Sequence, residues 1–160
     1  MKDEHILSAL GTRHEALSTI SHLPPLARER ARRELGLPAE HTGEHKIFVY
    51  GTLLTGERNA RWAANSRRTP AWTRGTIYDL HCGFPAYTRE GSGVVRGELL
   101  TADDAAFRMM DRLEGYPRLY RREEIEVVTE AGGRVRAWVY IMNALPEGAT
   151  PIASGDWRNR

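Results

Sequence analysis

Five segments rich in β-branched and aromatic residues follow residue 46, and they constrain the fold more than any other feature of the chain. Such residues favour extended backbone because their side chains pack well on a pleated surface. They predict strands at 47–53, 74–80, 94–100, 120–129 and 135–142. The last two segments flank a glycine-rich turn at 130–133, and side chains alternate in character along 135–141. This pattern predicts an antiparallel hairpin.

Helical signals lie between these segments. Thr101 and Asp104 have the spacing of a helix cap and predict a helix that runs to Leu113. Within it, Phe107 and Met110 fall with Leu113 on one face, which we expect to pack on the core. A second helix is predicted at 58–64, after Gly56.

The first 45 residues differ from the rest, because they contain no Phe, Trp or Tyr and five of the six histidines. Thr12 and Glu15 have capping-box spacing, and a charged helix is predicted at 26–35, after Pro24-Pro25 and before Gly36. We therefore expect an N-terminal helical arm at 1–45 and a folded domain at 46–160.

Composition excludes several classes of function. Cys82 is the single cysteine, so neither an internal disulfide nor a multi-cysteine metal site can form, and a cytoplasmic location is expected. Only Lys2 and Lys46 could serve as a Schiff-base or phosphate-loop lysine. The 23 basic and 21 acidic residues are spread along the chain, so no nucleic-acid partner is expected. No apolar run is long enough for a membrane span.

Two features suggest a small-molecule site. The apolar segment 47–50 runs into Gly51, where backbone N–H groups can approach an anion without a side chain in the way. Glu114 lies between the predicted helix and the next strand, where an acid can carry a proton.

Three other sites were weighed against this one. Cys82 beside His81 suggests a thiol nucleophile, but adjacent residues of a strand would face opposite sides of a sheet. His41 and His45 are four residues apart, but Gly43 between them and the lack of a third ligand argue against a metal site. Four arginines at 28–33 could contact phosphates, but acidic residues at 29 and 34 weaken that interpretation.

The motifs taken together resemble the γ-glutamylcyclotransferase-like superfamily, and most closely its γ-glutamylamine cyclotransferase and plant avirulence-induced-gene-like branch. The resemblance covers about residues 46–157. It rests on Tyr50-Gly51-Thr52-Leu53, Gly56 with Asn59, Gly83 to Tyr87, Leu113-Glu114-Gly115-Tyr116-Pro117 with Tyr120 and Arg121, and Ser154 to Trp157.

The resemblance implies an α+β fold, a small mixed β-barrel flanked by helices. It also implies an intramolecular cyclisation of the acyltransferase or lyase type, in which a γ-glutamyl amine or γ-glutamyl amino acid closes to 5-oxoproline and releases its amine. Glu114 would be the general acid and base, with Tyr50, Gly51, Thr52, Leu53 and Tyr120 in the substrate site.

No metal or organic cofactor is expected, and the expected partner is a small γ-glutamyl compound. The sequence leaves the oligomeric state open, with a dimer formed through the arm as one arrangement that it allows. The alternative function is a non-catalytic module that binds a small carboxylate or a protein on the same fold.

Overall fold

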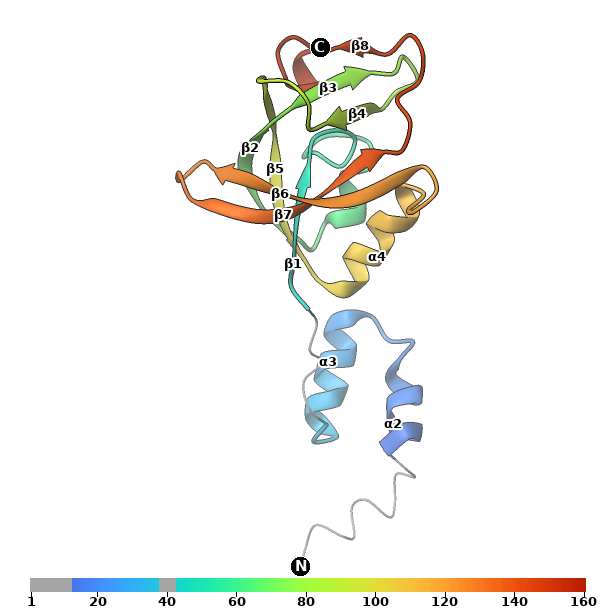
Figure 1. The fold of residues 1–160 in the computed structure, drawn as a ribbon. Coiled ribbons are helices and arrows are strands. Elements are labelled where there is room, and N and C mark those ends of the chain that lie inside the picture. Colours follow the sequence, from blue (N-terminus) through green and yellow to red (C-terminus); the bar gives the residue numbers. More distant parts are fainter. Residues whose placement is uncertain (1–12, 38–42) are drawn as a thin grey trace, which may run out of the picture. The chain divides into compact units, whose positions relative to one another are not determined.

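The computed structural model describes residues 13–37 and 43–160, which divide into two compact units between residues 41 and 42 (Figure 1). The N-terminal unit contains helices α2 (Arg13–Ile20) and α3 (Pro25–Glu34). The N–H groups of Gly36 and Leu37 bond back to carbonyls of the last turn of α3, so the predicted helix end at Gly36 is confirmed. The predicted cap at Thr12 and the candidate ligand His41 lie outside the described residues.

A closed mixed barrel forms the C-terminal unit, with strand order β1-β5-β2-β6-β7 (Figure 1). Its strands are β1 (His45–Val49), β2 (Arg67–Arg74), β5 (Val94–Ala102), β6 (Tyr120–Thr129) and β7 (Arg134–Met142). β1 pairs antiparallel with β5 and parallel with β7, which makes the barrel mixed. One face of the closed sheet buries apolar side chains that include Phe48, Leu99, Val127 and Val139. The predicted α+β barrel fold is therefore confirmed.

Smaller elements surround the barrel. A three-stranded sheet has the order β4-β3-β8, with β3 (Thr76–Asp79), β4 (Pro85–Thr88) and β8 (Thr150–Pro151). Helix α4 (Asp104–Leu113) buries Phe107 and Met110, as predicted. The short 3₁₀ helices are η1 (Ala60–Ala63) and η2 (Trp157–Asn159). No helix in the described part of the chain is long and apolar enough to cross a membrane.

The β6–β7 hairpin confirms the prediction at 120–129 and 135–142, and its register places Arg122 opposite Tyr140. The cap of α4 differs from the prediction, because the Asp103 side chain, and not Thr101, accepts from the Ala106 N–H at 2.7 Å. Asp103 immediately precedes the helix, where an acceptor reaches the free N–H groups of the first turn.

Several strand predictions were wrong. The predicted strand at 74–80 is two strands, because the chain leaves β2 for the second sheet at Gly75. The predicted strand at 47–53 ends at Val49, and the following residues form a turn. Residues 58–64 contain only the 3₁₀ helix η1 where a helix was predicted.

Candidate active site

The turn that follows β1 is the first part of the site. Gly51 lies against Pro85, and a Cβ atom at residue 51 would come within 2.7 Å of the Pro85 ring. Real Cβ atoms do not approach other heavy atoms so closely, so this position requires glycine for its packing. Thr52 and Leu53 are nearly as buried as the core, although they lie outside any strand.

Hydrogen bonds orient the peptide groups of this turn. The Asn59 N–H donates to the Thr52 carbonyl at 2.9 Å, and the Leu54 N–H donates to the Gly51 carbonyl at 3.0 Å. In a planar trans peptide the C=O and the N–H point in opposite directions. Each carbonyl that accepts one of these hydrogen bonds therefore has the N–H of the next residue on its other side. Among the residues that the structure describes, the N–H groups of Gly51, Thr52 and Leu53 have no acceptor. They are free to bind an anion.

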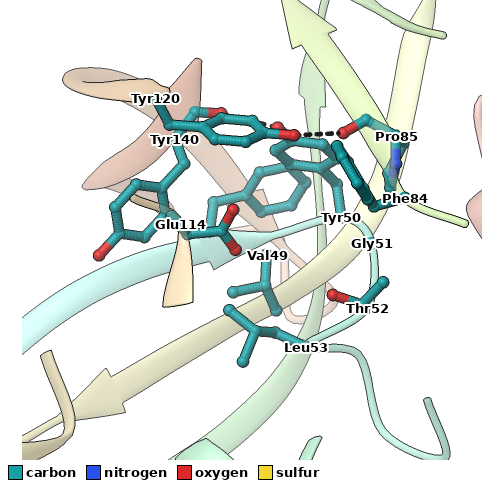
Figure 2. Close-up of a pocket in the computed structure, with 11 residues that line it drawn as sticks. Val49, Tyr50, Gly51, Thr52, Leu53, Phe84, Pro85, Glu114, Tyr120 and Tyr140 are labelled. Carbon is teal, nitrogen blue, oxygen red and sulfur yellow. Dashed lines mark hydrogen bonds between the residues drawn. The ribbon is translucent and has the colours of Figure 1, made fainter. Parts of the chain in front are cut away.

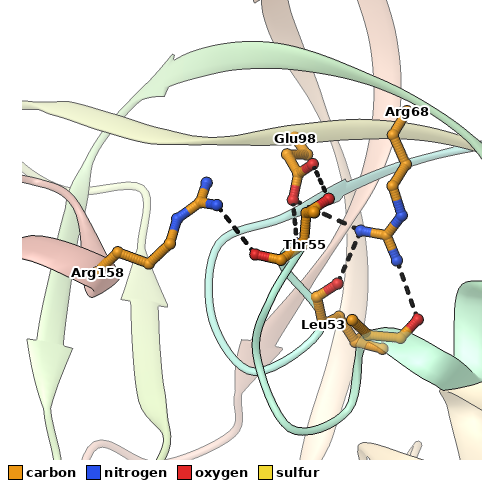
Figure 3. A network of polar contacts seen from close by, with 6 residues as sticks. Leu53, Thr55, Arg68, Glu98 and Arg158 are labelled. Atoms are coloured by element: carbon orange, nitrogen blue, oxygen red, sulfur yellow. Dashed lines mark hydrogen bonds and ion pairs between the residues drawn. The ribbon is translucent and has the colours of Figure 1, made fainter.

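A largely buried ion pair supports the turn (Figure 3). Glu98 of β5 is only 7% exposed and accepts from the N–H and the hydroxyl of Thr55, each at 2.6 Å. Arg68 of β2 donates to the Leu53 carbonyl at 2.8 Å and lies 3.5 Å from the Glu98 carboxylate. Arg158 donates to the Thr55 carbonyl at 3.1 Å. The turn is thereby tied to two barrel strands and to the C-terminal segment.

Neither Glu98 nor Arg68 was predicted as part of the site. An acid inside the apolar run of residues 94–100 was a signal for Glu98, since a buried carboxylate needs partners. Arg68 carried no such signal, because its segment was not recognised as a strand.

Glu114 is held by the end of α4. The N–H of Gly115 donates to the Arg112 carbonyl, and the N–H of Tyr116 donates to the Asp111 carbonyl. Gly115 has a positive φ of 62°, and together with these bonds it forms a Schellman motif in which Glu114 is the C-cap residue of α4. The motif fixes the backbone from which the Glu114 side chain enters the site.

One pocket brings together all the residues predicted for the site, namely Glu114, Tyr50, Gly51, Thr52, Leu53 and Tyr120 (Figure 2). Its empty volume is about 340 Å³, including the mouth that opens to solvent. Phe48, Val49, Phe84, Pro85 and Tyr140 complete the lining and were not predicted. Tyr140 could have been suspected, because it faces the same side of the hairpin as Tyr120.

The hydroxyl groups of the three pocket tyrosines donate their hydrogen bonds to groups other than Glu114, and two of these bonds are drawn in Figure 2. Tyr50 donates to the Tyr140 carbonyl at 2.7 Å, and Tyr120 donates to the Pro85 carbonyl at 3.0 Å. Tyr140 donates to the Asp111 carboxylate at 2.7 Å. A phenol has one proton, so none of the three can donate a second hydrogen bond to Glu114.

Glu114 is consequently a partly buried acid without a partner. In the described part of the chain, its carboxylate has neither a hydrogen bond nor an ion pair. Burial raises its pKa from 4.5 to about 7, because the charged form loses its hydration. Burial is also the largest cause that raises the pKa of Tyr50, and the nearby Glu114 carboxyl adds to it. The site can therefore bind an anion at the turn and exchange a proton at Glu114 near neutral pH.

The rival sites are arranged differently. Residues 80–84 form a bend, so the premise that His81 and Cys82 lie in a strand was wrong. His81 contacts Thr150 at 2.9 Å, and Cys82 is exposed. His45 pairs with Asp104 at 2.5 Å, and this bond lowers the pKa of Asp104.

The described residues contain no group of three or more His, Cys, Asp or Glu side chains that could hold a metal ion. Of the arginines weighed as phosphate ligands, Arg30 pairs with Glu34 at 3.1 Å, and Arg28 donates to the Leu23 carbonyl at 2.9 Å.

Comparison with known proteins gives a consistent result for the C-terminal unit. Residues 47–159 match the family model described as Gamma-glutamyl cyclotransferase, AIG2-like. A protein of Vibrio cholerae serotype O1, named provisionally as a gamma-glutamylcyclotransferase, is 35% identical over 120 residues, which are 73% of this chain and 98% of the relative. The gamma-glutamylcyclotransferase family protein YtfP of Escherichia coli K12 is 30% identical over 115 residues, with 72% and 97% covered.

Solved structures agree with this result. YkqA from Bacillus subtilis is 30% identical with a TM-score of 0.58, and the match covers 72% of this chain but only 40% of YkqA. An aig2-like protein from Mus musculus is 24% identical with a TM-score of 0.54, and the match covers 65% of this chain and 80% of the mouse chain. The mouse protein shares the fold.

Proposed function

Because the chain belongs to the gamma-glutamyl cyclotransferase, AIG2-like family, we propose that it converts a γ-glutamyl amine or γ-glutamyl amino acid to 5-oxoproline and releases the amine. One observation carries this proposal. A carboxyl group whose pKa is about 7 shares a small pocket with the free N–H groups of a fixed turn. The pocket therefore holds a proton acceptor and an anion cradle.

The reaction begins with loss of a proton from the substrate. The α-amine of a γ-glutamyl group is an ammonium ion at neutral pH, and it must become neutral before its lone pair can attack. Glu114 in its carboxylate form takes that proton. With a pKa of about 7, roughly half of the free protein has this form at neutral pH.

Ring closure follows. The amine nitrogen forms a bond to the γ-carbonyl carbon, and the carbonyl oxygen becomes an oxyanion. The N–H groups of Gly51, Thr52 and Leu53 are the donors available to that oxygen or to the substrate α-carboxylate. The protonated Glu114 then gives its proton to the leaving amine as the oxyanion returns to a carbonyl and the bond between that amine and the carbonyl carbon breaks. The ring nitrogen still carries an extra proton from the attack, and it loses this proton to the Glu114 carboxylate, from which the proton passes to solvent.

The tyrosines that line the pocket contribute through the shape that they give it. Tyr50, Tyr120 and Tyr140 cannot readily ionise, because burial raises the pKa of each. Their rings therefore exclude water and hold the amine close to the carbonyl, which lowers the entropic part of the barrier. Proton transfer and ring closure balance without a metal or an organic cofactor. A cytoplasmic location is also proposed, and the single cysteine supports it.

Mass-spectrometric detection of 5-oxoproline from a panel of γ-glutamyl amines and γ-glutamyl amino acids tests the proposal. The panel is incubated with the wild type, with Glu114→Gln and with Glu124→Gln, a control acid whose side chain is 49% exposed on the hairpin. We expect turnover by the wild type and by the control, and a loss of at least about 100-fold in Glu114→Gln.

Failure of the wild type to convert any compound would overturn the proposal. Thermal-shift measurements with small carboxylates on the same protein then test the alternative of a binding module. A shift that Gly51→Ala abolishes would support that alternative.

A further inference from the structure

Two charged residues lie behind the pocket wall without lining the pocket. Asp111 is on α4 three residues before Glu114, so the two carboxyl groups lie on one side of the helix. Arg122 is on β6, directly opposite Tyr140 in the hairpin register. The proposed reaction does not use either residue.

Arg122 is held in one place by aromatic rings. Its guanidinium lies 4.2 Å from the ring centre of Tyr116, 4.5 Å from that of Phe107 and 5.4 Å from that of Trp138. A cation over aromatic faces is attracted by the ring quadrupoles. Its fourth partner is the Asp111 carboxylate, which lies 3.4 Å from Nε. The side chain is thus fixed although it is partly exposed.

Asp111 has two partners on two strands. It neutralises Arg122 of β6 and accepts the Tyr140 hydroxyl of β7 at 2.7 Å. The Tyr140 hydroxyl points away from the Glu114 carboxylate as a result (Figure 2). Asp111 therefore engages a cation and a hydrogen-bond donor, and among the described residues neither of them bonds to Glu114, where each would stabilise a carboxylate.

Building on the proposed function, we propose that Asp111 and Arg122 are positioning residues that hold Tyr140 in place and keep uncompensated positive charge away from Glu114. Glu114 can then bind and release a proton in the pH range where the reaction needs it. Neither residue touches the substrate. They act by holding the Tyr140 side chain in place and by setting the electrostatic potential at the C-terminal end of α4.

Among the described residues that line the pocket, the other titratable side chains are three tyrosines. Tyr50 after β1, Tyr120 on β6 and Tyr140 on β7 face it in the pocket. Cys82 lies near enough to Tyr120 to raise the pKa of that tyrosine. Asp111 and Arg122 are the charged pair behind Tyr140 and do not line the pocket, so their replacement changes the charge there without altering the pocket lining.

The two replacements have opposite expected effects. Asp111→Asn keeps an acceptor for Tyr140 but removes a negative charge and leaves Arg122 unneutralised, so the pKa of Glu114 falls by about one. Arg122→Met keeps a long side chain among the aromatic rings but leaves Asp111 unneutralised, so the pKa of Glu114 rises. Arg122→Lys keeps the charge and leaves that pKa near the wild-type value.

Carbon-13 NMR titration of the side-chain carboxyl groups measures these values without any substrate. The Glu114 signal is assigned as the one missing from Glu114→Gln, and Glu126→Gln serves as the control, since Glu126 belongs to an exposed ion pair of the same hairpin. Shifts in opposite directions for Asp111→Asn and Arg122→Met, with no shift in the control, support the inference. Shifts in one direction, or none, overturn it.

If one of the two variants does not fold, the sign measured for the other decides. The titration also separates this inference from the proposed function. A wild type that makes no 5-oxoproline overturns the proposed function, whereas the effect of Asp111 and Arg122 on Glu114 is still measured.

Discussion

Replacing Glu114 with glutamine is expected to stabilise the protein above neutral pH. The unfolded chain releases this proton near pH 4.5 and the folded chain near pH 7, because burial raises the pKa of the folded carboxyl. Between these values the folded state binds more protons than the unfolded state, so its stability falls as pH rises. A pKa rise from 4.5 to about 7 corresponds to about 3.4 kcal/mol.

The wild type therefore loses about 3 kcal/mol of this contribution between acidic and alkaline pH, and Glu114→Gln does not. Urea unfolding of both proteins at several pH values from about 4.5 to about 8.5 measures the difference in the free energy of unfolding. Subtracting the free energy of unfolding of the wild type from that of the variant at each pH removes the contributions of the other titrating groups, because both proteins share them. We expect Glu114→Gln to gain stability relative to the wild type as pH rises from about 4.5 to about 7, and the difference to level off above that pH.

The matched control is Glu124→Gln, in which an exposed acid of the hairpin is replaced in the same way. Its difference from the wild type should stay nearly constant over the same pH range. A constant difference for Glu114→Gln as well would refute the reasoning, because the Glu114 carboxyl would then titrate equally in both states.

Three further substitutions test the turn and the walls of the pocket. Gly51→Ala places a Cβ atom 2.7 Å from the Pro85 ring, so we expect thermal unfolding to show a loss of stability of about 1–3 kcal/mol and kcat/KM to fall. Unchanged stability and kcat/KM would contradict the close packing. Arg68→Met leaves Glu98 buried without a cation and should cost about 3 kcal/mol in urea unfolding, whereas a neutral result would mean that the pair does not support the turn. Tyr50→Phe removes a buried 2.7 Å hydrogen bond and should cost about 1–3 kcal/mol while turnover persists, and a loss as large as that of Glu114→Gln would contradict a shaping role.

Elements with regular side-chain periodicity were the ones that the sequence predicted well. The β6–β7 hairpin has alternating side chains and a glycine-rich turn, and α4 has its apolar residues on one face. β2 was missed because Arg67, Arg68 and Pro70 give it a polar N-terminal half. Every residue of β2 pairs with β5, so pairing with another segment of the chain, and not its own side-chain pattern, defines it as a strand.

Sequence motifs indicated the candidate site better than its support. The turn at residues 50–53 and Glu114 lie in short motifs, and the structure places both in one pocket. Glu98 contacts Thr55 across 43 residues of sequence, and Asp111 contacts Tyr140 across 29. Asp111 resembles an ordinary surface acid in the sequence. The apolar run around Glu98 indicated a buried acid but not its partner, because another segment of the fold supplies that partner.

The pH dependence of kcat/KM for 5-oxoproline formation tests the central claim most directly, since it reports the ionisation of the free protein. We expect kcat/KM to rise with pH through a midpoint of about 7 and Glu114→Gln to show almost no turnover at any pH. A profile without this rise, or full turnover by Glu114→Gln, would contradict the claim that Glu114 carries the proton.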